Sequence, residues 1–184
     1  MSTDHLKKLS KSLSYVLRHR PDSVGLDLAA GGWIRVDELL SALSASGRPL
    51  SLELLQQIVA KNGKQRFEFG GDGSLIRARQ GHSVKVDLQY EPAVPSPVLY
   101  HGTARHNLDS IFVQGLVKGR RHHVHLSTNR HTMLQVAQRH GKPILLAVDA
   151  EQMHADGHAF FVTGNHVWLT ESVPPQYLVL VEED

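Results

Sequence analysis

The apolar positions near the N-terminus recur every three or four residues, which is the spacing of an amphipathic helix. The stripe consists of Leu6, Leu9, Leu13, Val16 and Leu17. We expect this helix to end before Pro21, because the residue ahead of a proline avoids the helical region of backbone space. Two further helices are predicted, one capped by Asp37 and closed by Gly47, and one capped by Ser51 and stopped by the Asn-Gly pair at 62–63.

Alternation of apolar and polar residues takes over after these helices. The segments 65–69 and 74–79 alternate and are separated by the turn sequence Gly-Gly-Asp-Gly, which predicts a β-hairpin. A short strand is predicted over 33–36, ahead of the second helix. Helices followed by a hairpin are typical of a winged-helix module.

The second half of the chain is dominated by strands, with few helices between them. This pattern favours an α+β fold with a sheet sandwich over a doubly wound parallel sheet. The predicted helices cover 105–115, with Leu108, Ile111 and Phe112 facing inward, and 130–141. The predicted strands cover 98–103, 123–127, 143–150, 159–163, 166–170 and 177–183.

Three prolines fall between these two halves. Pro92, Pro95 and Pro97 cannot continue a helix or a central strand, so they favour an extended linker. We therefore expect an N-terminal lobe over 1–90, a linker over 91–97 and a C-terminal lobe over 98–184.

Composition limits the classes of function. The apolar fraction of 41% and the charged fraction of 21% are those of a soluble globular protein. The chain has no cysteine, which excludes disulfides, thiolate zinc sites and cysteine nucleophiles. A net charge of +2 with 13 histidines is compatible with an anionic partner. No apolar run is long enough for a membrane span or a signal peptide, so we expect a cytoplasmic protein.

The segment 119–127, Gly-Arg-Arg-His-His-Val-His-Leu-Ser, concentrates basic residues. His123 and His125 are two apart on a predicted strand, so they share a face and offer a pair of nitrogen ligands. The segment has no nearby carboxylate, and the chain has no His-Glu-x-x-His motif. We therefore expect no metal site.

Phosphate is the second candidate ligand, because guanidinium groups bind phosphate oxygens in a bidentate manner. Arg120 and Arg121 precede the histidine strand, and Arg18 and His19 lie at a predicted helix end. Lys64 and Arg66 stand at the start of a predicted strand. Arginines from three segments could converge on one phosphate. A solvated basic turn is the simpler interpretation of any one segment alone.

A nucleotide is the third candidate, carried by Tyr-His-Gly-Thr at 100–103. A glycine lets a ligand approach the backbone, and Ser127 and Thr128 add hydroxyl groups at a neighbouring strand end. Rossmann and P-loop motifs are absent, and no Gly-x-Ser-x-Gly motif supplies a nucleophile. If the chain is an enzyme, its candidate active groups are mostly cationic. Such groups neutralise charge on phosphoryl oxygens and do not act as covalent nucleophiles.

Six segments occur together in the order of a known family: 9–21, 64–69, 76–83, 99–103, 120–127 and 167–178. In this arrangement the chain resembles the RNA 2′-phosphotransferase family over nearly its whole length. The resemblance implies a winged-helix lobe that engages RNA and a C-terminal lobe with the ADP-ribosyltransferase fold that binds NAD⁺.

The resemblance also implies a two-step reaction on an internal RNA 2′-phosphate, such as the splice-junction phosphate of tRNA. The phosphate attacks the ribose carbon that bears nicotinamide, and nicotinamide leaves. The ribose 2″-hydroxyl then attacks the phosphorus, which gives RNA with a 2′-hydroxyl and ADP-ribose 1″,2″-cyclic phosphate.

The residues that this resemblance assigns to each substrate follow from the matching motifs. The catalytic set is Arg18, His19, Arg66 and Arg121, with Arg120 as the substitute for Arg121. The NAD⁺ set is His101, Gly102, Thr103, His123, His125, Ser127 and Val167. The set expected near the RNA or its phosphate is Lys64, Gln80, His82, Ser83 and Arg120.

Two positions distinguish the chain further. Related ADP-ribosyltransferases commonly have a glutamate where this chain has Val167, and an anionic phosphate nucleophile does not need one. The family commonly has a glycine where this chain has His166. The alternatives are an ADP-ribosyltransferase that stops after the first step and a non-catalytic winged-helix nucleic-acid binder. We expect a monomer.

Overall fold

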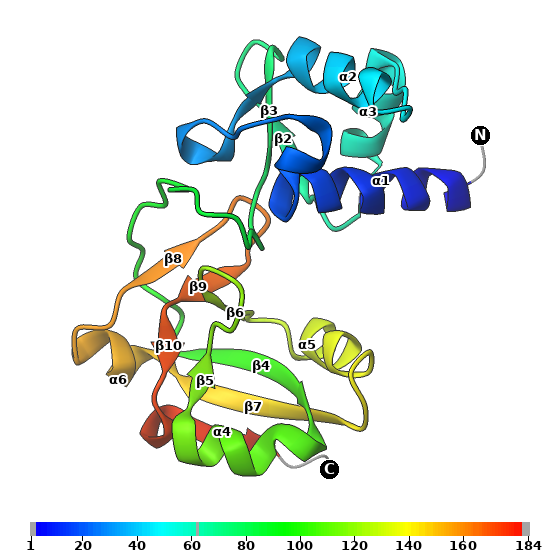
Figure 1. Cartoon of the computed structure of the whole chain (residues 1–184). Coiled ribbons are helices and arrows are strands. Elements are labelled where there is room, and N and C mark those ends of the chain that lie inside the picture. Colours follow the sequence, from blue (N-terminus) through cyan, green and yellow to red (C-terminus); the bar gives the residue numbers. More distant parts are fainter. Residues whose placement is uncertain (1–2, 62, 182–184) are drawn as a thin grey trace. The chain divides into compact units, whose positions relative to one another are not determined.

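The computed structural model describes residues 3–61 and 63–181, and the chain divides into two compact units, Met1–Gln89 and Tyr90–Asp184. Both units mix helices with small antiparallel sheets, so the α+β prediction is confirmed (Figure 1). The winged-helix and ADP-ribosyltransferase assignments stay predictions. No helix in the described part of the chain is long and apolar enough to cross a membrane.

The first unit packs three helices against a small sheet. Its sheet has the strand order β1-β3-β2, and both pairings are antiparallel. The helices are α1 (Thr3–Arg18), α2 (Val36–Ala45) and α3 (Leu52–Ala60), with 3-10 turns at Pro21–Val24 and Ala30–Gly32. The strands are β1 (Ile34–Arg35), β2 (Phe67–Phe69) and β3 (Leu75–Ala78).

The predicted apolar stripe of α1 forms part of the core of this unit. Leu13, Val16 and Leu17 are buried, and they share one apolar cluster with residues of α2, α3 and the hairpin. The helix ends at Arg18, before Pro21, as predicted. The hairpin over β2 and β3 is also confirmed.

One predicted helix cap is right and one is wrong. The Ser51 hydroxyl accepts a hydrogen bond from the Leu54 amide at 3.3 Å, which confirms it as the N-cap of α3. Asp37 is not the cap of α2, because the helix already begins at Val36 and Asp37 forms an ion pair with Arg35 at 2.7 Å. The predicted stop at Asn62 lies outside the described residues.

The second unit contains three small antiparallel sheets, with strand orders β11-β7-β4, β6-β9-β8 and β10-β5. An isolated bridge between Tyr100 and Ser127 connects β4 to the residue after β6. The strands are β4 (Val98–Ala104), β5 (Leu116–Val117), β6 (Val124–Leu126), β7 (Pro143–Asp149), β8 (Phe160–Val162), β9 (Trp168–Thr170), β10 (Ser172–Val173) and β11 (Leu178–Val181). The helices are α4 (Leu108–Gln114), α5 (Arg130–Ala137) and α6 (Ala150–Ala155), with 3-10 turns at Arg105–Asn107 and Pro175–Tyr177.

Some predictions for this unit need correction. Phe112 was expected to face inward on α4, but it is 41% exposed, whereas Ile111 is buried. The predicted linker is not wholly detached, because Pro92 bridges Phe161 and the Ala93 amide donates to the Phe160 carbonyl at 2.8 Å. The chain therefore already follows the edge of β8 before β4 begins.

Candidate functional site

The C-terminal end of α1 presents Arg18 and His19. The amides of Ser83 and Val84 donate to the Arg18 carbonyl at 2.9 and 3.4 Å, so they satisfy a carbonyl that a helix end leaves without a partner. The His19 Nδ1 lies 2.9 Å from the Ser83 hydroxyl oxygen. Ser83 therefore holds both the helix end and the imidazole ring, the latter through Nδ1.

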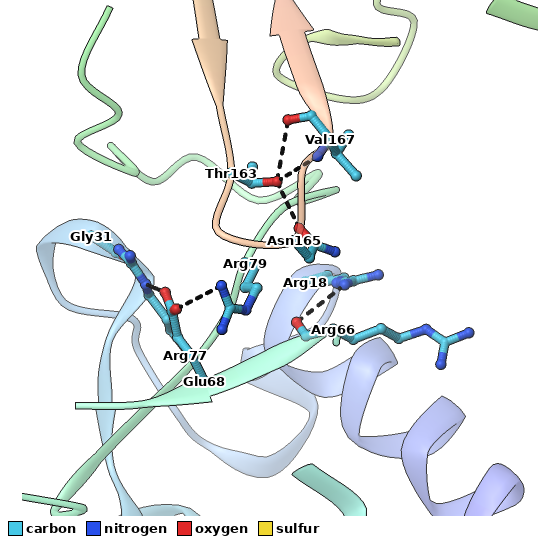
Figure 2. Close-up of polar contacts among 9 residues, drawn as sticks. All are labelled: Arg18, Gly31, Arg66, Glu68, Arg77, Arg79, Thr163, Asn165 and Val167. Atoms are coloured by element: carbon cyan, nitrogen blue, oxygen red, sulfur yellow. Dashed lines mark hydrogen bonds and ion pairs between the residues drawn. The ribbon is translucent and has the colours of Figure 1, made fainter. Parts of the chain in front are cut away.

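Arg66 lies directly beside this helix end. An Arg18 guanidinium nitrogen donates to the Arg66 carbonyl at 3.4 Å, and the Arg79 amide also donates to that carbonyl at 2.9 Å. Figure 2 shows the Arg66 side chain extended away from its own carbonyl, with its guanidinium group at the far end. The structure thus brings Arg66 beside the adjacent residues Arg18 and His19, from which the sequence separates it by more than forty residues.

The hairpin that carries Arg66 is braced by charged side chains. Glu68 accepts a charge-assisted hydrogen bond from Arg77 and lies 3.1 Å from an Arg79 guanidinium nitrogen. Arg77 also donates to the Gly31 carbonyl at 3.1 Å (Figure 2). Its guanidinium group lies over the ring of Trp33, 4.4 Å from the ring centroid. Because these side chains are mostly shielded from water, the ion pairs hold the hairpin more firmly than exposed pairs would.

The other residues predicted near the RNA phosphate have varied surroundings. Lys64 is exposed, whereas the His82 side chain is fully buried. The Gln80 side-chain oxygen is shielded from solvent and has no hydrogen-bond partner among the described residues.

In the second unit, His101 on β4 is held by the neighbouring strand. Its Nδ1 lies 3.0 Å from the His125 carbonyl oxygen, and because a carbonyl only accepts, Nδ1 carries the proton. Burial lowers the pKa of His101, the hydrogen bond to His125 partly offsets this, and the charge of Arg121 lowers it further. His101 is therefore neutral at pH 7, with Nε2 as a hydrogen-bond acceptor.

His125 and Arg121 lie next to each other. A guanidinium nitrogen of Arg121 is 3.3 Å from His125 Nδ1, and since guanidinium only donates, this nitrogen of His125 is the acceptor. Arg120 is also exposed, but the contacts to the histidines come from Arg121. This geometry favours Arg121 over Arg120 as the functional arginine of the pair.

His123 belongs to a cluster of rings. Its imidazole lies 5.9 Å from the ring of Tyr90 and 5.5 Å from the ring of Phe161, measured between centroids. Burial lowers the pKa of His123, and the charges of His122 and Lys118 lower it further. His123 therefore offers an uncharged aromatic edge, and its surroundings differ from those of His125.

Gly102 and two hydroxyl residues have clear structural roles. A Cβ on Gly102 would collide with the backbone carbonyl of Met133 on α5, so the glycine is explained by helix packing as well as by access for a ligand. Thr103 is buried and accepts from the Asn107 amide group at 3.2 Å. Ser127 is buried and its hydroxyl accepts from the Asn129 amide at 3.0 Å.

Val167 lies at the end of a tight turn between β8 and β9. The Thr163 hydroxyl accepts from the Val167 amide at 3.1 Å and lies 2.6 Å from the Asn165 side-chain oxygen (Figure 2). His166 has a φ of 60°, in the left-handed region where glycine is free of steric cost. His166 adopts this conformation at a cost of about 1 kcal/mol.

Sequence reasoning missed the residues that hold these groups in place. Asn107 and Thr163 each contact a residue four positions away, and Glu68 pairs with Arg79 across the hairpin. These side chains were not singled out, because their contacts depend on how the turns and the hairpin fold. Among the described residues, no group of three or more His, Asp or Glu side chains is arranged to hold a metal ion.

Comparison with known proteins decides the family. Residues 4–172 match the model of the "RNA 2'-phosphotransferase, Tpt1 / KptA family". The chain belongs to the RNA 2′-phosphotransferase family. The resemblance drawn from the sequence motifs is therefore confirmed.

Individual relatives agree with this assignment over almost their full lengths. A "Probable RNA 2'-phosphotransferase" of Nostoc punctiforme is 51% identical over 178 residues, which cover 97% of this chain and 98% of that protein. Proteins with the same name from Agrobacterium fabrum and Pseudomonas aeruginosa are 53% identical over 171 residues and 50% identical over 179 residues. These alignments cover 93% and 97% of this chain, and 92% and 98% of the two relatives.

Proposed function

We propose that this chain removes an internal 2′-phosphate from RNA and that it consumes NAD⁺ as a co-substrate. In the first step, a 2′-phosphate oxygen attacks C1″ of the nicotinamide ribose, and the bond from C1″ to nicotinamide breaks. In the second step, the ribose 2″-hydroxyl attacks the phosphorus and the RNA 2′-oxygen leaves with a proton. The products are RNA with a 2′-hydroxyl, nicotinamide and ADP-ribose 1″,2″-cyclic phosphate.

One observation in the first unit carries the proposal furthest. Arg18 and His19 stand at the end of α1, where Ser83 holds the imidazole and the Arg18 guanidinium group reaches the backbone carbonyl of Arg66. A dianionic phosphate matches two guanidinium groups and an imidazole, because each offers charge-assisted hydrogen bonds. The family's name supports this choice of ligand.

The roles of these groups follow from their chemistry. Arg18 and Arg66 offset the negative charge of the 2′-phosphate, and Arg121 of the second unit has the same role for the charge that develops during transesterification. His19, which Ser83 holds through Nδ1, is proposed to donate to the phosphate or to transfer the proton of the ribose hydroxyl.

The second unit supplies the groups proposed for NAD⁺. The neutral His101 accepts a hydrogen bond from a ribose hydroxyl through Nε2, and the backbone of Gly102 lies near the nicotinamide amide. We propose that His123, His125, Thr103, Ser127 and Val167 also contribute to the NAD⁺ site. The hydrocarbon of Val167 cannot act as a base, which suits a nucleophile that is already anionic.

The natural substrate proposed here is an RNA with a splice-junction 2′-phosphate, as in tRNA splicing, and the site of action is the cytoplasm. We propose that one copy of the chain suffices for the reaction. An ADP-ribosyltransferase that stops after the first step would give RNA that keeps both its phosphate and an ADP-ribose group.

The test is to incubate the protein with a 2′-phosphorylated oligoribonucleotide, with and without NAD⁺. The expected result is dephosphorylated RNA and one nicotinamide for each RNA, and only when NAD⁺ is present. An unphosphorylated oligoribonucleotide is the matched control and should release no nicotinamide. Loss of the phosphate without consumption of NAD⁺ would overturn the mechanism.

A further inference from the structure

A groove of about 430 Å³ lies within the first unit, where α1 and α3 approach each other and the chain continues to β2. These helices are the blue and cyan coils labelled in Figure 1. The residues that line it are Leu6, Lys7, Ser10, Lys11, Gln57, Ile58, Lys61, Gly63, Lys64 and Arg66. The lysines of this groove were not singled out by the sequence motifs, with the exception of Lys64.

The rim of the groove is strongly cationic. Lys7 and Lys11 stand on α1, and Lys61 and Lys64 follow α3, and all four are exposed. Among the described lining residues none is acidic, and within the described part of the chain Lys7, Lys11 and Lys61 form no salt bridge. Like charges around one groove repel one another, and a polyanion bound there would offset this repulsion.

The floor of the groove is apolar. Ile58 is 2% exposed and Leu6 is half-buried, so apolar atoms lie between the two cationic walls. A ligand that fits this arrangement carries regularly spaced negative charges and also flat or apolar groups. Single-stranded nucleic acid has both features, because phosphates alternate with sugars and bases.

The groove leads to the arginine cluster. Arg66 lines the groove and also contacts Arg18 through its carbonyl. At 1.5 Å of helix rise per residue, Lys11 lies roughly 10 Å and Lys7 roughly 16 Å along α1 from Arg18. Gln65, between Lys64 and Arg66, has a φ of 43°, a strained conformation of the kind that folds keep at functional sites.

We propose that this groove binds the sugar-phosphate backbone of single-stranded RNA that flanks the 2′-phosphate. Lys7 and Lys11 contact phosphates from one wall, and Lys61 and Lys64 contact them from the other. The position of the 2′-phosphate rests on the proposed function, but the affinity of the groove for an RNA strand does not.

The first test measures binding of an unphosphorylated oligoribonucleotide by fluorescence anisotropy, in the absence of NAD⁺. The double variant Lys7→Gln/Lys11→Gln should bind roughly ten-fold more weakly at low salt. The slope of log affinity against log salt should fall in magnitude by about 1.4, because each lost contact to a single strand contributes about 0.7. A second double variant, Lys61→Gln/Lys64→Gln, alters the opposite wall and should show the same loss.

Lys8→Gln is the matched control. Lys8 is exposed on the same helix but does not line the groove, so this variant should bind RNA like the unaltered chain. If the two double variants bind RNA as tightly as Lys8→Gln while circular dichroism shows that all are folded, the proposal is overturned. An acidic peptide as the true occupant would give that same negative result.

The second test uses turnover and separates this proposal from the proposed function. The substrates are a short 2′-phosphorylated RNA and two longer ones, extended on the 5′ or on the 3′ side. One of the two extensions should lower the KM of the unaltered chain. In Lys7→Gln/Lys11→Gln the same extension should leave the KM unchanged. If the extension lowers the KM of the double variant as well, the proposal that the groove binds RNA is contradicted. If no substrate turns over but RNA binding still depends on the lysines, the proposed function fails and the groove stands.

Discussion

At the scale of single residues, Arg120 and Arg121 are neighbours in the chain with different surroundings. Arg121 lies beside His125, and its charge lowers the pKa of His101, whereas these contacts do not involve Arg120. The sequence motif assigns the catalytic role to Arg121, with Arg120 as the substitute. The contact between the side chains of Arg121 and His125 supports the choice of Arg121 for this role.

The first prediction tests the arginines. Arg18→Ala and Arg121→Ala should each slow the second step by roughly a hundred-fold, since each removes a cation that offsets developing charge on the phosphate. ADP-ribosylated RNA should then accumulate, which mass spectrometry of the RNA detects. Arg120→Ala should have a clearly smaller effect. The assignment is wrong if turnover is unaffected in both variants, or if Arg120→Ala is the slowest.

The second prediction concerns pH and His101. Because the folded pKa of His101 is lowered, the unfolded chain binds a proton at this residue at a pH where the folded chain does not. Acidification from the unfolded pKa of about 6.5 towards the lower folded pKa therefore decreases the free energy of unfolding. Above the unfolded pKa, the contribution of His101 to the free energy of unfolding is fully present.

Urea unfolding of the unaltered chain and of His101→Asn, at pH 7.5 and pH 5, checks this sign. The unaltered chain should lose more stability than the variant on acidification, because the variant lacks the titrating group. A variant with the same or a larger loss would show that His101 is not held neutral by the fold.

At the scale of elements, the packing of α5 on β4 depends on Gly102. We predict that Gly102→Ala lowers the free energy of unfolding by about 2 kcal/mol, because the added methyl group meets the Met133 carbonyl and a backbone atom cannot rotate away. Gly71→Ala is the control, since a Cβ there has nothing within 4 Å. Chemical denaturation followed by circular dichroism measures both, and equal stability of the two variants would contradict the packing argument.

Long elements with a clear period could be predicted from the sequence, and short ones could not. The stripe of α1 and the alternation of β2 and β3 recur often enough to be recognised. The strands β5 and β10 have two residues each, too few to show any period. The helix α6 was missed because its first residue continues an apolar strand, although Asp149 caps it by accepting from the Gln152 amide.

At the scale of the whole molecule, the order of the motifs along the chain identified the family without any structure. That order contains residues such as Arg18 and Arg66, which the fold of the first unit then brings together. The lysine groove could not be predicted in this way, because it needs α1 and α3 to pack side by side and no motif encodes that pairing. Local sequence patterns therefore predict the candidate catalytic residues. The RNA-binding groove proposed here becomes visible only when the packing of the helices is known.

The measurement that tests the central claim most directly follows one labelled phosphorus atom. The protein is incubated with NAD⁺ and an oligoribonucleotide that carries ³²P only in its 2′-phosphate. We predict that the label leaves the RNA and appears in ADP-ribose 1″,2″-cyclic phosphate, with none released as inorganic phosphate. Label found as inorganic phosphate, or retained on RNA that has not reacted with NAD⁺, would contradict the account.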